Sequence, residues 1–139
     1  MRIETLLTDS ASRNPGKTAL VAGDTRLTYR EMDLKSDRLA AQLQKRGVKP
    51  DDRIVFLLDN GSEIVLSFFA SWNIGATACP LPPSIKAEKL AEIFRSIEPA
   101  AIVAHVRLVP VVEAACALWG ELPQLIVAQA EPALADTLS

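Results

Sequence analysis

This sequence of 139 residues has no cluster of glycines, a single histidine and no long apolar run. Its six glycines are scattered, whereas phosphate-binding loops need clustered glycines whose backbone N–H groups can approach a phosphate. The Walker and dinucleotide-binding fingerprints are therefore absent, as is a serine in a glycine-flanked nucleophile elbow. No apolar run reaches the roughly 20 residues that span a bilayer, and Glu4 and Asp9 interrupt the place of a signal peptide. We therefore expect a cytoplasmic protein without a membrane span.

The sequence also has only two cysteines and no large excess of either charge. Cys79 and Cys116 do not have the spacing of metal ligands, so we interpret them as free thiols in a reducing compartment rather than as disulfide partners or metal ligands. The formal net charge of -2 indicates neither a nucleic-acid partner nor an anionic membrane. Hydrophobic residues make up 49% of the chain, which is enough for the core of one domain.

Candidate catalytic residues are few. His105, the one histidine, is expected just beyond the C-terminal end of a strand, where ligands of open parallel sheets usually bind. No acid or nucleophile lies near it in the sequence to orient it as a general base, so a hydrogen-bonded or surface role is favoured. No pair of carboxylates stands out as an acid and a base. The sequence thus predicts no catalytic, cofactor-binding or metal-binding residue in this chain.

The pattern of apolar residues predicts an α/β fold. Two β-prone runs, Thr18–Ala22 and Thr25–Thr28, flank Gly23-Asp24 and predict an N-terminal β-hairpin. Continuous apolar runs, typical of strands covered on both faces, predict four further strands. These strands are Ile54–Leu58, Thr77–Pro80, Ala100–Ala104 and Leu125–Ala128. Helical patterns separate them, so we expect a three-layer fold with a mainly parallel sheet and helices on both faces.

The helices have recognisable start and stop signals. A short first helix carries Ile3, Leu6 and Leu7. Thr28 and Glu31 form a predicted capping box for a helix that ends at Gly47. Ser62 and Ser84 are expected to cap the next two helices, and Pro110 fits the first turn of the last one. The apolar residues expected to face the core are Met32, Leu39, Ala40 and Leu43 in one helix and Phe68, Phe69 and Trp72 in the next.

Two segments follow the ends of predicted strands. Three prolines occupy positions 80–83, where they fix the backbone and remove N–H donors. They can be read as the rigid wall of a cleft or as a strand terminator, and we favour the terminator. Asp59 and Asn60 follow the preceding strand, and roles in a turn or cap are favoured for them over roles in a site.

Two motifs, in this order and spacing, resemble those of one enzyme family. Leu27–Glu31 reads Leu-Thr-Tyr-Arg-Glu and looks like the early Leu-Thr/Ser-Tyr-x-Glu motif of the adenylate-forming (AMP-binding) enzymes, which include CoA synthetases, peptide-synthetase adenylation domains and luciferases. The segment 73–81 resembles their Lys-Ala-Gly-Ala-x-x-x-Pro-Leu motif, although Trp72-Asn73-Ile74 replaces the usual small and basic residues. Pro82 stands where adenylation domains commonly have Asp and CoA synthetases often have Asn, and this departure favours acyl- or aryl-CoA synthetases. The resemblance extends to about Val127.

The resemblance implies a ligase that uses ATP to convert a carboxylate to an acyl-adenylate and then forms a thioester with CoA. The family performs this with a Ser/Thr/Gly-rich loop carrying a lysine, an acid for Mg²⁺, an acid for the ribose and a lysine on a mobile C-terminal domain. None of these motifs occurs in this sequence. ATP, Mg²⁺ and CoA are thus implied for a full-length enzyme, and no cofactor is expected in this chain.

The expected organisation is an N-terminal subdomain over residues 1–128 and a linker or truncated tail over residues 129–139. The leading hypothesis is an N-terminal fragment of such a ligase, inactive alone, whose partner is the remainder of the enzyme. Apolar surface around Leu125–Leu138, left exposed where that remainder would dock, predicts self-association. One alternative is a stand-alone, non-catalytic interaction module of the same fold, and another is a flavodoxin-like ligand binder, which the missing phosphate loop disfavours. The acid activated, and the choice between CoA and a carrier protein, stay open.

Overall fold

The computed structural model describes residues 10–22, 25–58 and 62–128 of the chain. The predicted first helix with Ile3, Leu6 and Leu7 lies outside the described residues, although residues 10–13 are helical. The described elements, in chain order, are β1 (Thr18–Ala22), β2 (Thr25–Thr28), α2 (Tyr29–Lys45), β3 (Arg53–Leu57), α3 (Ser62–Asn73), β4 (Thr77–Pro80), α4 (Ala87–Ile97), β5 (Ala101–His105), the 3-10 helix η1 (Val106–Leu108), α5 (Val109–Trp119) and β6 (Gln124–Ala128).

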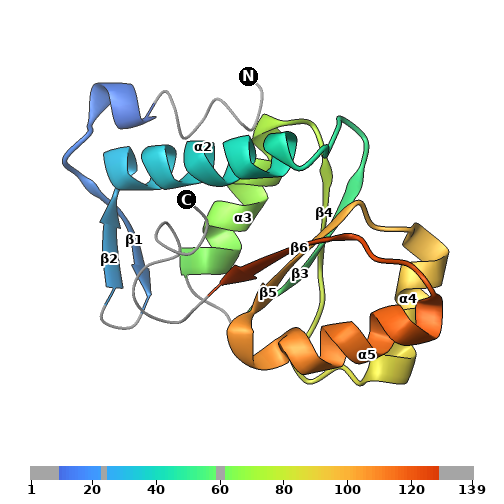
Figure 1. Cartoon of the computed structure of the whole chain (residues 1–139). Coiled ribbons are helices and arrows are strands. Elements are labelled where there is room, and N and C mark those ends of the chain that lie inside the picture. Colours follow the sequence, from blue (N-terminus) through green and yellow to red (C-terminus); the bar gives the residue numbers. More distant parts are fainter. Residues whose placement is uncertain (1–9, 23–24, 59–61, 129–139) are drawn as a thin grey trace.

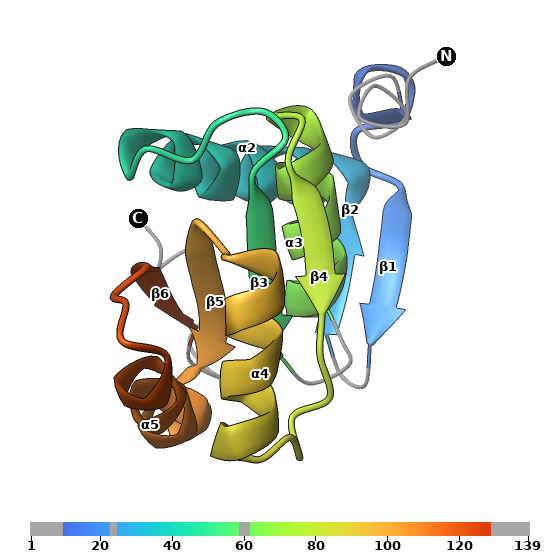
Figure 2. The ribbon, with the colours of Figure 1, turned by 90° about the vertical axis from the view of Figure 1, so that its right-hand side faces the viewer.

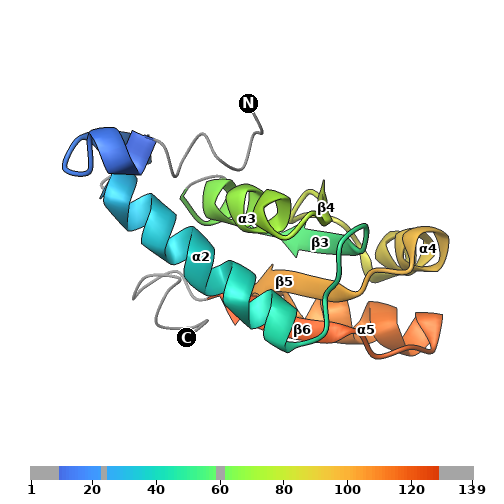
Figure 3. The ribbon, with the colours of Figure 1, turned by 90° about the horizontal axis from the view of Figure 1, so that it is seen from above.

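Four strands form a parallel sheet in the order β4-β3-β5-β6 (Figure 1). Helices α2 and α3 cover one face of this sheet, and α4 and α5 cover the other, as Figures 2 and 3 show from two further directions. The predicted three-layer α/β architecture with a parallel sheet is therefore confirmed. None of the helices in the described ranges is long and apolar enough to cross a membrane.

The N-terminal strands form a separate two-stranded sheet. β1 and β2 pair antiparallel and have the bounds that the sequence predicts. The predicted turn residues Gly23 and Asp24 lie outside the described residues, so the turn of the hairpin is not tested. Both strands contact α2, which follows β2 directly and places this small sheet beside the α2 and α3 face.

Helix α2 begins with the predicted capping box. The Glu31 N–H donates to the Thr28 Oγ1 at 3.1 Å, and the Thr28 N–H donates to the Glu31 Oε1 at 2.8 Å. The four predicted core residues of this helix are all buried. Gly47 follows the helix with a positive φ of 92°, a conformation that a residue with a Cβ adopts only with strain.

The core consists of two apolar layers, one on each face of the sheet. Successive residues of β3 contribute to opposite layers, so Phe56 packs beneath α2 and α3 while Val55 packs beneath α4 and α5. Residues 54–57 and 101–104 have no exposed surface. This burial explains why β3 and β5 read as continuous apolar runs, since both of their faces and both of their edges are covered.

The start of α4 differs from the prediction. Ser84 does not cap this helix, because the chain first closes a turn in which the Ile85 N–H donates to the Pro82 carbonyl oxygen at 3.1 Å. Helix α4 begins at Ala87 after an extended Lys86, with no side-chain cap. Strand β5 is also displaced by one residue from its predicted start, and β6 begins one residue early, at Gln124. Pro110 lies in the first turn of α5, as predicted.

Candidate functional site

The carboxyl ends of the four parallel strands meet at one edge of the sheet, where ligands of such folds usually bind. The strands end there at Leu57, Pro80, His105 and Ala128. Asp59 and Asn60, which the sequence places at this edge, lie outside the described residues. The described part of the edge therefore offers His105 and the proline-rich segment as its candidate residues.

His105 is the last residue of β5 and has a structural contact. Its Nδ1 accepts a hydrogen bond from the Arg107 N–H at 3.2 Å, which makes it the N-cap of η1. The ring is half-buried, and its cap links β5 to the turn that leads into α5. This geometry agrees with the favoured hydrogen-bonded role and gives no support to a role as a general base.

The proline-rich segment ends β4 and turns the chain away from the sheet. Pro80 is opposite Phe56 in the register of β4 and β3, and the Leu81 N–H donates to the Phe56 carbonyl oxygen at 2.9 Å. Leu81 then packs against the apolar layer beneath α4 and α5. These contacts support the terminator interpretation, while the role as a cleft wall stays untested.

The aromatic side chains of α3 contact one another and are not fully buried. Phe68 stacks on Trp72 with ring centroids 5.5 Å apart and 24° between the planes. Phe68 also meets Phe56 edge-on at 6.5 Å, and Phe69 meets Trp72 edge-on at 5.5 Å. All three α3 aromatics are half-buried, so their predicted core role is only partly correct.

The two cysteines are free thiols on different elements, β4 and α5. Burial raises the pKa of the Cys116 thiol, and the nearby Glu113 carboxylate raises it further. Burial also raises the pKa of the Cys79 thiol, although Arg53 opposes the shift. Because the thiolate is the nucleophile, both groups are poor candidates for covalent catalysis.

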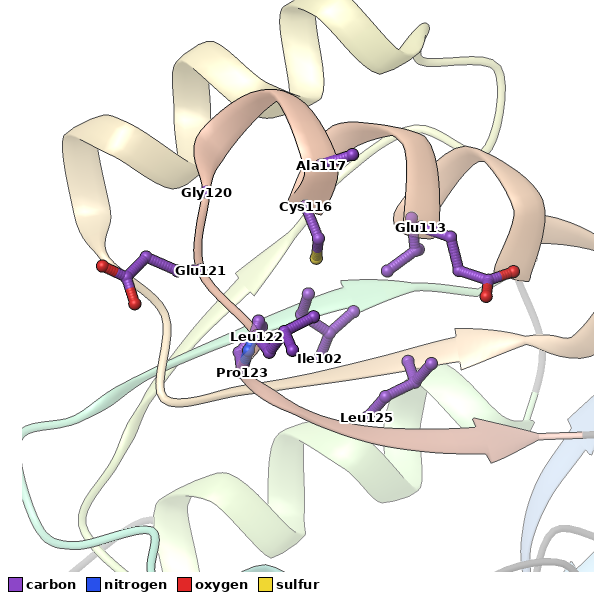
Figure 4. A pocket seen from close by; sticks show the side chains of 10 residues that line it. Ile102, Glu113, Cys116, Ala117, Gly120, Glu121, Leu122, Pro123 and Leu125 are labelled. Carbon is purple, nitrogen blue, oxygen red and sulfur yellow. The ribbon is translucent and has the colours of Figure 1, made fainter.

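An apolar groove between α5 and β6 was missed by the sequence analysis. It has a volume of about 500 Å³. Its apolar lining includes Ile102, Val112, Cys116, Leu122 and Leu125. Figure 4 shows Cys116 above and Ile102 and Leu125 below the hollow, with the carboxylates of Glu113 and Glu121 directed away at its two ends. Leu122 is 91% exposed, the largest value among the large exposed hydrophobic residues of the described chain.

A second, polar hollow lies on the opposite face of β6, at the end of α2. It has a volume of about 560 Å³ and is lined by Gln42, Lys45, Arg46, Gly47 and Gln124. The Arg46 Nη1 donates to the Gln124 Oε1 at 3.4 Å, so the end of α2 is tied to the start of β6. The two hollows share β6 between them. One signal for these hollows was available in the sequence, namely an apolar last strand without a charged residue.

Neither a glycine-rich phosphate loop nor a cluster of metal ligands is found among the described residues. No group of three or more His, Cys, Asp or Glu side chains within these residues is placed to hold a metal. No run of closely spaced glycines offers backbone N–H groups to phosphates.

Comparisons with known proteins identify the class of protein. The sequence pattern of the AMP-binding enzymes matches residues 7–138, and the chain belongs to this family. It is 41% identical over 90 residues to phosphinothricin tripeptide synthetase PhsC of Streptomyces viridochromogenes, covering 65% of this chain and 8% of that protein. It is 35% identical over 98 residues to 2,3-dihydroxybenzoate-AMP ligase of Bacillus subtilis, covering 70% of this chain and 18% of that ligase.

Solved structures share the fold. A benzoate CoA ligase from Burkholderia xenovorans superposes with a TM-score of 0.86 at 23% identity, covering 99% of this chain and 28% of that one. A fatty acyl CoA synthetase from Mycobacterium tuberculosis superposes with a TM-score of 0.82 at 26% identity, covering 91% of this chain and 26% of that one. The chain thus spans less than a fifth of the two curated relatives above and about a quarter of these two structures. The resemblance to adenylate-forming enzymes is confirmed.

Proposed function

We propose that this chain forms the N-terminal scaffold of a ligase that uses ATP to convert a carboxylic acid to its acyl-adenylate and then transfers the acyl group to CoA. The observation that carries the proposal is the family match over residues 7–138, which includes every described element. The similarity to a ligase that adenylates an aromatic acid supports the first step. The division into a subdomain over residues 1–128 and a tail over residues 129–139 is part of this proposal.

In this proposal, the residues of this chain support the active site and supply none of its reacting groups. The buried strands β3 and β5 form a rigid base, and their carboxyl ends face the place where a site is built in such sheets. Joining a carboxylate to a triphosphate brings anions together, so the reaction needs fixed positive groups and hydrogen-bond donors around the developing charge. We assign these groups to the remainder of the enzyme, because the printed sequence has no loop suited to phosphates. The isolated chain is therefore predicted to be inactive.

The proposal also names CoA as the acceptor of the acyl group. Pro82 departs from the Asp that adenylation domains of peptide synthetases commonly have, and this favours CoA over a carrier protein. Peptide synthetases are nevertheless among the sequence relatives, so the opposite choice has its own support. The buried, free thiol of Cys116 is typical of a reducing compartment, and we propose a cytoplasmic location, where ATP and CoA are available.

Mass spectrometry of the products tests both steps. The longest product of the reading frame is incubated with ATP, Mg²⁺ and panels of aryl, fatty and amino acids, and CoA is added in a second stage. We expect an acyl-adenylate with one class of acid, followed by its conversion to an acyl-CoA. An adenylate that CoA does not consume would overturn the choice of acceptor. A folded product that forms no adenylate with any panel would overturn the proposed activation and favour the non-catalytic module.

A further inference from the structure

Helices α4 and α5 lie side by side on the same face of the sheet, but the surfaces that they turn away from it differ (Figure 2). The exposed positions of α4 are all polar, namely Glu88, Lys89, Glu92, Arg95 and Ser96. The exposed positions of α5 recur at helical spacing and include one charged residue, namely Pro110, Glu113, Ala114, Ala117 and Leu118. A charged outer face is typical of a helix in contact with water, whereas a helix that is apolar on nearly every side is typically covered on every side. The sequence of α5 therefore indicates a partner on its outer face.

The apolar surface of α5 continues into the loop that follows the helix. Leu118 is 52% exposed, and Leu122 is 91% exposed. Ala117 and Leu122 both line the apolar groove, so the helix and the loop form one continuous surface. A single exposed leucine is ordinary, but a contiguous apolar surface marks an interaction site. We call this surface, which is formed by Pro110, Ala114, Ala117, Leu118 and Leu122, the α5 face.

The α5 face carries an apolar projection beside an apolar hollow. Leu122 is the projection, and the groove of about 500 Å³ between α5 and β6 is the hollow (Figure 4). A two-fold axis makes such a surface complementary to itself, because the projection of each copy meets the hollow of the other. On the helix itself, the short side chains of Ala114 and Ala117 allow a second helix to approach to about 8 Å, the lower end of the usual distance between helix axes. The shape of the α5 face thus fits a second copy of this chain.

The charges around the α5 face also favour a second copy. Glu113 is the one charged residue of α5. The Arg95 Nη2 donates to the Leu118 carbonyl oxygen at 2.9 Å, which holds a guanidinium group beside the last turn of α5. When two copies of α5 pack antiparallel, the first half of one helix meets the last turn of the other, so Glu113 of each copy approaches Arg95 of the other. Two such pairs at the rim fix the orientation of the helices and add little affinity.

We propose that the α5 face is the interface of a symmetric dimer, in which α5 packs antiparallel against α5 of a second copy and Leu122 of each copy enters the groove of the other. This inference goes beyond the proposed reaction and does not depend on it. With 11 residues, α5 is about 16 Å long and about 10 Å wide, far smaller than the roughly 800 Å² that each partner buries in a standard interface. We therefore expect a weak dimer, with a Kd on the order of 10–100 µM.

Sedimentation velocity tests the proposal on the chain of 139 residues and on the longest product of the reading frame, each between about 5 and 500 µM, a range that brackets the expected Kd. We expect both proteins to pass from monomer to dimer as the concentration rises, without larger species. Leu122→Glu places a charge in the apolar groove and should raise the Kd about tenfold or more. The matched control is Leu34→Glu, which makes the same change at another exposed leucine, on α2, and should leave the Kd unchanged.

Each of three other results would overturn the proposal. Monomers at every concentration, or association that Leu122→Glu weakens no more than Leu34→Glu does, would mean that the α5 face is not an interface between copies. A dimer of the short chain that is absent from the longer product would assign the α5 face to the remainder of the enzyme. Species larger than a dimer would indicate a head-to-tail contact in place of two-fold symmetry. Far-UV circular dichroism of both variants checks that they are folded.

An exchange of charges tests the antiparallel orientation. Glu113→Arg and Arg95→Glu each place like charges at both rims of the dimer, so we expect each single variant to raise the Kd about threefold or more. The double variant Glu113→Arg/Arg95→Glu restores opposite charges and should return the Kd close to that of the parent chain. Loss of the bond from Arg95 to Leu118 cannot explain such a recovery, because the double variant lacks that bond as well. A double variant as weak as the single variants would overturn the antiparallel pairing.

Discussion

The centre of the parallel sheet and its β6 edge place opposite demands on the sequence. Residues 54–57 of β3 and 101–104 of β5 are fully buried, and each of these strands is paired on both sides. Within the described residues, β6 is paired on one side only, and it lies between an apolar groove and a cationic hollow. This chain therefore builds its stability at the centre of the sheet, and its described residues leave open surface at one edge.

Truncating the largest side chain of the central strands should have the largest effect. Phe56 is fully buried in β3, with its ring 6.5 Å from that of Phe68. We expect Phe56→Ala to lower the free energy of unfolding by about 3–5 kcal/mol, because it removes apolar contacts and leaves a cavity. Urea denaturation followed by far-UV circular dichroism measures the change. The matched edge variant is Leu122→Ala, which should change it by less than about 0.5 kcal/mol, and equal losses would contradict the comparison.

Proline substitutions at neighbouring positions of β6 distinguish the N–H groups that point toward β5 from those that point away from it. Ile126→Pro removes a donor that points toward β5 and truncates a buried side chain, so we expect a loss of about 2–4 kcal/mol. Val127→Pro removes a donor that points outward, and its cost in the chain of 139 residues should be about 1 kcal/mol or less. Thermal unfolding of both variants checks the difference. A Val127→Pro variant as unstable as Ile126→Pro would show that the outer edge is already paired.

Thiol labelling compares two positions in the same apolar layer, Cys79 on the edge strand β4 and Cys116 on α5. The pKa values of Cys79 and Cys116 are raised by burial, so both thiols are protonated at neutral pH. We expect labelling by a disulfide reagent to accelerate about tenfold for each pH unit between pH 7 and 9, as the thiolate fraction grows. The half-buried Cys79 should react faster than the buried Cys116. The single variants Cys79→Ser and Cys116→Ser separate the two rates, and rapid labelling at pH 6 would contradict the raised pKa values.

The same shifts predict how stability changes at high pH. A thiol whose pKa is raised in the folded state binds its proton more tightly there than in the unfolded chain. Its contribution to stability is complete below the ordinary value of 9.0 and is lost as the pH rises through the raised value. The Cys116→Ser variant should therefore lose less stability than the parent chain above pH 9.

The smallest expected effect lies on the surface between α2 and α3. Burial raises the pKa of Asp37, Asp33 adds to the shift, and a hydrogen bond from Asn73 opposes it. The charged form of Asp37 is thus disfavoured in the folded state, and the penalty applies at pH values above its raised pKa. We expect Asp37→Asn to stabilise the chain by less than about 1 kcal/mol at pH 7. The gain should vanish as the pH falls below 3.8, the ordinary value, and a gain that persists there would contradict this cause.

The elements that the sequence predicts best depend on local signals. The capping box of Thr28 and Glu31 fixes the start of α2 because both partners lie within one turn. The bounds of β1, β2 and β4 agree with the prediction because turn residues or prolines delimit them. Ser84 is not the cap of α4. It lies within the turn from Pro82 to Ile85, two positions before the actual N-cap, Lys86.

The groove and the open edge could not be predicted in this way, because they depend on the order of the strands. The alternating pattern of strands and helices is compatible with several orders, and the observed order β4-β3-β5-β6 makes the last strand an edge. Leu125 therefore looks like any other residue of a buried strand until the sheet is assembled. The half-burial of Phe68, Phe69 and Trp72 likewise depends on the tertiary packing around α3, which the helical pattern alone does not give.

Carboxylate-dependent ATP–pyrophosphate exchange tests most directly whether this chain is the scaffold of an adenylate-forming ligase. It is measured on the longest product of the reading frame and on the chain of 139 residues, with aryl, fatty and amino acids as substrates. We predict exchange by the longer protein with one class of acid and none by the shorter chain. Exchange by the shorter chain, or its absence with every acid in a folded longer protein, would contradict the account.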